Sequence, residues 1–162
     1  MNLLDREFWE IASYGVTVVG LPLAIATFLV EQRKERRNEE EEIWQRLTDA
    51  YLDFLETVLA NPDLHLRTAR TTPGLTPEQE ERKLVIFDML ITLFERAYLV
   101  AWEPDMPPDK ARRWNSWEDW MREWCRREDF VNCLPQLLRG EDPDFAAYIR
   151  RIAEEEARAV AA

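Results

Sequence analysis

Cysteine, histidine and glycine are scarce in this sequence of 162 residues, which has two Cys, one His and four Gly. Cys125 and Cys133 form no CxxC pair and fall in the part of the chain that we place in the reducing cytoplasm, so we expect free thiols. A zinc site would need His65 to converge with these two thiols, but their spacings match no familiar ligand pattern. We therefore predict no structural disulfide, no bound metal and no other cofactor.

The sequence also lacks the short motifs that mark catalytic sites, since no GxSxG, Walker A, HExxH or dinucleotide fingerprint occurs. Basic residues are outnumbered, with 21 Lys and Arg against 32 Asp and Glu, and the net charge of -11 repels phosphate backbones. Alternating apolar runs bounded by turn signals are missing, whereas 3.6-residue periodicity recurs. We predict an all-α protein that is not an enzyme and does not bind nucleic acid.

The longest hydrophobic run covers residues 11–30, twenty residues without a charge. At 1.5 Å per residue it spans roughly 30 Å, the thickness of the hydrocarbon core of a bilayer. We predict a single transmembrane helix from about Phe8 to Val30. Four basic residues follow it closely: Arg33, Lys34, Arg36 and Arg37. By the positive-inside rule, they place the C-terminal side in the cytoplasm and the N-terminus outside.

Other interpretations of the apolar segments fit less well. A cleaved signal peptide would follow basic residues, but the flank Asp5-Arg6-Glu7 is not basic. A buried core helix would avoid an interior proline such as Pro22, which lipid-embedded helices tolerate better. A second span over residues 84–102 is disfavoured by Asp88, Glu95 and Arg96. We therefore divide the chain into a tail, membrane helix and basic segment over residues 1–36 and a cytoplasmic helical domain over residues 37–162.

Helix signals predict a bundle of about four further helices after the membrane helix, and we expect the membrane helix to continue to Ala60 because no Pro or Gly occurs between Leu23 and Ala60. Thr76 and Pro77 start a central helix that ends near Trp102. We expect its broad apolar face, including Leu90, Leu99 and Val100, to be buried. The remaining helices are expected at residues 109–127, at residues 129–139 and from Pro143 with Asp142 as N-cap, and we expect the tail from residue 153 to fray.

Two residue stripes are candidate contact surfaces. The membrane segment carries small residues at 4,3,4,3 spacing, which allows close helix approach and favours self-association: Ser13, Thr17, Gly20, Ala24 and Thr27. Small residues are also common in membrane helices generally, so this pattern has a second explanation. In the cytoplasmic domain a tryptophan cluster predicts core packing, with contact to a protein or membrane surface as the alternative: Trp114, Trp117, Trp120 and Trp124.

The layout resembles small, uncharacterised bacterial membrane proteins with one N-terminal span, a basic juxtamembrane helix and a helical cytoplasmic domain. The resemblance is strongest in the Trp117-Glu118-Asp119-Trp120 helix, the Arg127–Phe130 turn and the segment from Asp144 to Ile149. It implies a domain of unknown function and carries no functional residues to this chain.

These observations predict a membrane-anchored, non-enzymatic interaction or scaffold module that self-associates or binds a protein partner. One alternative is a homo-oligomeric channel or membrane-perturbing effector in which Ser13, Thr17 and Thr27 line a narrow polar path. An enzyme without a recognisable motif is a more distant alternative.

Overall fold

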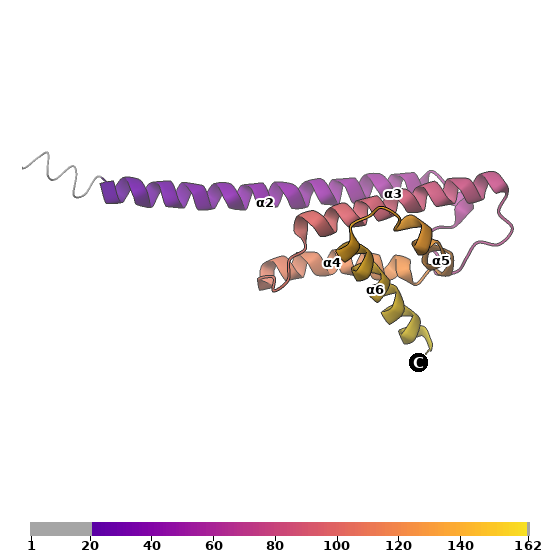
Figure 1. The fold of residues 1–162 in the computed structure, drawn as a ribbon. Helices are drawn as coiled ribbons and strands as arrows, with labels where there is room; N and C mark the ends of the chain where they lie inside the picture. The colour runs from indigo at the N-terminus through magenta and orange to yellow at the C-terminus, as the bar shows by residue number, and fades with distance from the viewer. Residues whose placement is uncertain (1–20, 162) are drawn as a thin grey trace, which may run out of the picture. The chain divides into compact units, whose positions relative to one another are not determined.

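The computed structural model describes residues 21–161, and these form helices and loops with no strand among them (Figure 1). The all-α prediction is confirmed. Contacts within the chain divide it between Trp44 and Gln45 into two compact units. Helix α2, Leu21–Leu59, runs across this division, as expected from the absence of Pro and Gly between Leu23 and Ala60.

The predicted transmembrane segment is only partly described. Over residues 21–161 no helix is long and apolar enough to cross a membrane. Residues 8–20 of the predicted span lie outside the described part of the chain, so the span stays a prediction.

The second unit contains the end of α2, the short 3-10 helix η2 (Pro62–Leu64), and helices α3 (Pro77–Ala101), α4 (Pro108–Cys125), α5 (Glu128–Leu137) and α6 (Pro143–Ala161). The predicted bundle of four further helices is thus present. Figure 1 shows α3 and α4 side by side with α6 running obliquely past α4, and α3 contacts α4, α5 and α6.

Local capping starts two of these helices where the sequence predicts. At α3 the Thr76 hydroxyl accepts from Gln79 N at 3.2 Å, while the Gln79 side chain accepts from Thr76 N at 2.9 Å. At α6 the Asp142 carboxylate accepts from the backbone N–H groups of Asp144 and Phe145 at 2.9 and 3.0 Å. These bonds satisfy N–H groups that have no partner within the first helical turn, so each start is encoded within four residues.

Aromatic residues join α2 and α4 inside the second unit. Tyr51 stacks on Trp120 with ring centroids 4.1 Å apart, and Phe54 meets Trp124 edge-on at 5.7 Å. The centre of the core is made by large side chains that are less than 2% exposed: Phe87, Leu90, Ile91, Phe94, Trp117, Met121, Phe130, Phe145, Ile149 and Ile152. The core-packing interpretation of the tryptophan stripe is confirmed for Trp114, Trp117 and Trp124, which are 2–3% exposed.

Two expectations about helix faces and ends are wrong. The tail from residue 153 does not fray, because α6 continues to Ala161 and its Glu155 and Glu156 are paired with Arg122 of α4 at 2.8 and 3.2 Å. On α3 the predicted buried face is too broad. Leu99 and Val100 are 57% and 51% exposed, because the neighbouring helices cover only the opposite side of α3.

Candidate interaction site

A buried arginine holds the loop after η2 against the junction between α4 and α5. Arg127 is 1% exposed, and its Nη1 donates to the carbonyl oxygens of His65 and Thr68 at 2.9 and 3.0 Å. Its Nη2 donates to Thr72 Oγ1 at 3.3 Å and to Asp129 Oδ2 at 2.9 Å. The Arg127 Nε and Asp129 Oδ1 atoms do not meet hydrogen-bond geometry, but at 2.6 Å they are in ion-pair contact.

Asp129 also connects this arginine to α3. Its Oδ2 lies 3.2 Å from Lys83 Nζ, which is 2.7 Å from Glu80 Oε2. Burial by itself lowers the pKa of Lys83, but hydrogen bonds to Glu80 and Asp129 outweigh this and raise it, so the ammonium stays charged. Neither Lys83 nor Glu80 was among the candidate residues predicted from the sequence, and Arg127 and Asp129 were named only as part of the Arg127–Phe130 turn. The available signal was Lys83 on the apolar stripe of α3, at helical spacing from Phe87 and Leu90.

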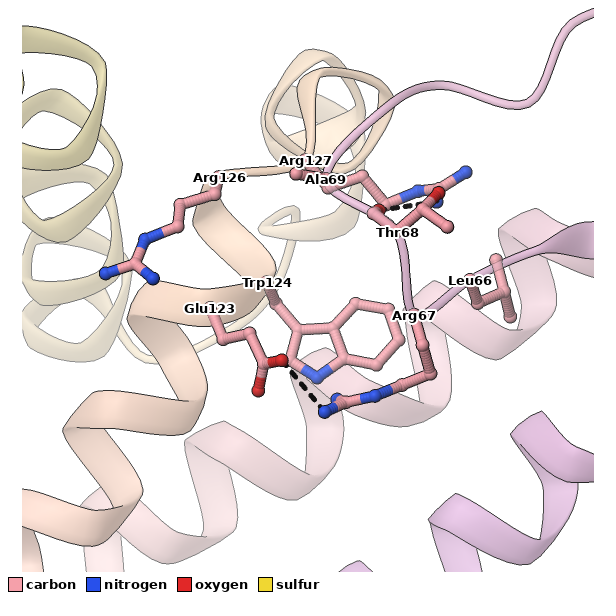
Figure 2. Close-up of a pocket in the computed structure, with 8 residues that line it drawn as sticks. All are labelled: Leu66, Arg67, Thr68, Ala69, Glu123, Trp124, Arg126 and Arg127. Carbon is pink, nitrogen blue, oxygen red and sulfur yellow. Dashed lines mark hydrogen bonds and ion pairs between the residues drawn. The ribbon is translucent and has the colours of Figure 1, made fainter. Parts of the chain in front are cut away.

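The same loop and the end of α4 enclose a cavity of about 190 Å³ (Figure 2). In Figure 2 the Arg67 side chain reaches toward the edge of the Trp124 indole, where its guanidinium lies 2.8 Å from the Glu123 carboxylate and 5.9 Å from the ring centroid. The cavity is lined by Leu66, Arg67, Thr68, Ala69, Glu123, Trp124, Arg126 and Arg127.

Three arginines line this cavity, yet each already has a carboxylate partner. Arg67 pairs with Glu123 at 2.8 Å, Arg126 with Glu156 at 2.7 Å, and Arg127 with Asp129. An anion entering the cavity would therefore compete with existing ion pairs instead of meeting unneutralised charge. The lining side chains also include no nucleophile beside a general base. The lining of this cavity thus favours a structural role, in which its ion pairs hold the loop against the end of α4.

A second polar cluster joins α4 to α6. The buried Trp114 Nε1 donates to the Tyr148 hydroxyl at 2.9 Å, and that hydroxyl donates to Glu118. Glu118 also accepts from Arg122, which contacts two glutamates of α6 as well. Burial, followed by the bond to Glu118, raises the pKa of Tyr148 far above its ordinary value. The hydroxyl therefore remains protonated and acts as a fixed link between the helices.

Two carboxyl groups meet where the turn before α6 touches α3. The hydrogen bond between Glu141 and Glu95, then burial and the charges of Glu95 and Asp88, raise the pKa of Glu141 to about 7. Glu95 also accepts from the backbone N–H of Asp142. Glu141 is therefore partly protonated near neutral pH, because ionising a second carboxylate beside Glu95 is unfavourable.

The exposed side of α3 carries the apolar surface that these polar clusters leave uncovered. Val85, Met89 and Leu99 are 52%, 44% and 57% exposed, and Val100 beside them is 51% exposed. We use "outer face of α3" for the residues at 4,3,4,3 spacing on this side: Val85, Met89, Thr92, Arg96 and Leu99. A shallow groove on it is lined by Val85, Asp88, Met89, Thr92, Leu93 and Arg96.

The candidate residues predicted from the sequence differ in exposure. Trp114, Trp117 and Trp124 are buried and Trp120 is half-buried. The basic residues Arg33, Lys34, Arg36 and Arg37 are exposed on α2.

Of the small-residue stripe, Ser13, Thr17 and Gly20 lie outside the described residues. Ala24 and Thr27 are exposed, and the Thr27 hydroxyl donates to Ala24 O at 2.9 Å. That hydroxyl is therefore bonded within its own helix.

The three candidate metal ligands also differ in exposure. His65 is exposed at the end of η2, Cys125 is buried and Cys133 is half-buried, and both thiols are free. Among residues 21–161 no group of three or more His, Cys, Asp or Glu is arranged to hold a metal ion.

Comparisons with known proteins add no assignment: no protein-family model, curated protein or solved structure matches this chain. The resemblance to bacterial single-span membrane proteins stays a prediction.

Proposed function

We propose that this protein is a membrane-anchored, non-enzymatic interaction module, with its N-terminus outside and its helical domain in the cytoplasm. One observation carries the proposal. At the start of α2, six large apolar residues within ten positions are 47–63% exposed: Leu21, Leu23, Ile25, Phe28, Leu29 and Val30.

At 100° per residue these side chains lie on two opposite sides of the helix, with Leu23 and Val30 facing away from the other four, instead of forming one apolar face. Burying each of them is worth about 1.5–3 kcal/mol relative to leaving it in water. A helix that is apolar on every side is stable when an apolar medium surrounds it, and a bilayer supplies that medium. The uncharged run begins upstream at residue 11, and exposed basic residues follow it at Arg33 and Lys34.

The helical domain supports the interaction part of the proposal. Its buried polar side chains, such as Arg127 and Lys83, are occupied in joining loops and helices. Among its exposed apolar residues, Val85, Met89 and Leu99 lie together on the outer face of α3, whereas Leu52, Leu59 and Val160 lie singly on α2 and α6. An exposed apolar stripe bordered by charges is typical of a protein-contact surface.

Membrane extraction of the full chain tests the anchor. We expect the wild-type protein to stay in the membrane pellet after alkaline carbonate and to be released by detergent. The variant with Leu21→Asp and Ile25→Asp should move to the supernatant, because each carboxylate costs about 2.5–3.5 kcal/mol near the centre of a bilayer.

The matched control exchanges the same two positions for apolar residues, Leu21→Ile with Ile25→Leu, and should remain in the pellet. Wild-type protein that is released by carbonate alone would refute the anchor. Protease added to intact cells should leave the C-terminal domain uncut, and cleavage there would refute its cytoplasmic location.

A further inference from the structure

The outer face of α3 and the groove on it carry opposite charges placed symmetrically about Thr92. Asp88 lies four residues before Thr92 and Arg96 lies four residues after it, and all three side chains are exposed. Asp88 and Arg96 line the same groove, with Met89 and Thr92 between them along the helix. Neither charge forms an ion pair within residues 21–161.

We propose that this face binds a second copy of the same chain, with the two α3 helices antiparallel about a two-fold axis at Thr92. Such an axis places each residue opposite the one equally far on the other side of Thr92. Asp88 of each copy then faces Arg96 of the other, and Val85 faces Leu99. Two ion pairs and two apolar contacts thus form from a single surface that is complementary to itself.

The alternative pairings of this face fit its charges less well. Parallel α3 helices would bring Asp88 against Asp88 and Arg96 against Arg96, which is repulsive. Charges that change sign symmetrically about one residue make a surface complementary to a second copy of itself, which is what an isologous contact needs, and an unrelated partner gives no reason for that symmetry. The charge order therefore favours a second copy over another protein.

The expected contact is small. From Val85 to Leu99 the face is about 21 Å long at 1.5 Å per residue, so one helix pair buries less area than a standard stable interface. We expect a reversible dimer that a covalent trap will capture. This inference deepens the proposed function by naming the partner of the interaction module.

Disulfide trapping in the detergent-solubilised full chain tests the geometry. Thr92→Cys, in a Cys133→Ser background, places one thiol of each copy at the two-fold axis. Packed helix axes are 8–10 Å apart, which brings side chains at the contact within disulfide reach. We expect a covalent dimer under mild oxidation. Leu52→Cys, at a residue of α2 that is 54% exposed, is the matched control and should form far less dimer.

Charge reversal then tests the pairing. In the Thr92→Cys chain, Arg96→Asp or Asp88→Arg alone should lower the trapped dimer about tenfold, because each makes both ion pairs repulsive. Mixing the two single-reversal chains should restore trapping between them, since every cross-pair is again of opposite charge. Both positions are exposed, so circular dichroism should show unchanged folding.

Two outcomes would overturn the proposal. One is trapping at Thr92→Cys no greater than at Leu52→Cys. The other is strong trapping that neither charge reversal weakens, which would mean that another surface brings the copies together. The membrane anchor is judged separately by carbonate extraction. A chain that stays in the membrane pellet but forms no disulfide-linked dimer at Thr92→Cys would refute the dimer alone. A chain that forms this dimer but is soluble without detergent would refute the anchor alone.

Discussion

Replacing Arg127 by methionine should destabilise the helical domain by about 3–5 kcal/mol, the usual cost of removing one partner of a buried ion pair. The substitution leaves the His65 and Thr68 carbonyl oxygens without their donor and leaves Asp129, which is 8% exposed, with Lys83 as its remaining cation. Each unsatisfied buried group costs about 1–3 kcal/mol, and methionine recovers part of that loss by packing.

The matched control is Arg67→Met, which removes an arginine from the same cavity. The side chains of Arg67 and Glu123 are 47% and 45% exposed, so their ion pair contributes up to about 1 kcal/mol. Urea unfolding of the detergent-solubilised full chain, followed by tryptophan fluorescence, measures both variants. With a slope of about 2 kcal/mol per molar urea, the Arg127 variant should unfold about 2 M earlier.

Equal midpoints for the two variants would refute the assigned role of Arg127. A second comparison distinguishes two causes of the lost stability: the loss of packing by the Arg127 side chain and the loss of the cation beside Asp129. If the cost comes from leaving Asp129 without its arginine partner, adding Asp129→Leu to Arg127→Met should restore part of the stability, because a buried ion pair replaced by apolar residues is often neutral. Further loss in the double variant would contradict that explanation.

Three other measurements test the remaining clusters. Glu141 has a folded-state pKa of about 7, above its ordinary value, so its stabilising protonation is complete below about pH 4.5 and is lost as the pH rises through 7. Unfolding free energy should therefore fall by about 1 kcal/mol from pH 5 to pH 8 after allowance for partial exposure, and Glu141→Gln should flatten this dependence. Tyr148→Phe should cost about 1–3 kcal/mol in urea unfolding, because the buried Trp114 N–H loses its acceptor; a cost below about 0.5 kcal/mol would contradict the link. Burial raises the pKa of Cys125 to about 12, so maleimide at pH 7.5 should label Cys133 first and Cys125 only on unfolding.

Helix starts were the part of the fold most accessible from sequence. Thr76 with Gln79, and Asp142 with the first turn of α6, form their caps within four residues, so the information is local. The tryptophan stripe was similarly readable, because 3.6-residue spacing identifies a face before its neighbours are known. The end of α6 was not readable, since its last turns depend on Arg122 and Arg126, about 30 residues earlier.

The candidate interaction site was likewise predicted only in part from the sequence. Periodicity indicated that α3 has a broad apolar side, but Leu99 and Val100 belong to its exposed part because α4, α5 and α6 cover only the opposite face. Likewise, Arg127 reads as an ordinary charged residue in a turn. Its acceptors at His65 and Thr68 are about 60 positions away, so only the folded chain brings them together.

The sequence by itself determined the helical class, the order of the helices and the apolar run before Glu31, because these follow from spacing, caps and composition within short windows. Tertiary structure alone decided which charges are buried and which apolar residues stay exposed. Burial depends on what packs against each face, and that partner is set by contacts between residues far apart in the chain.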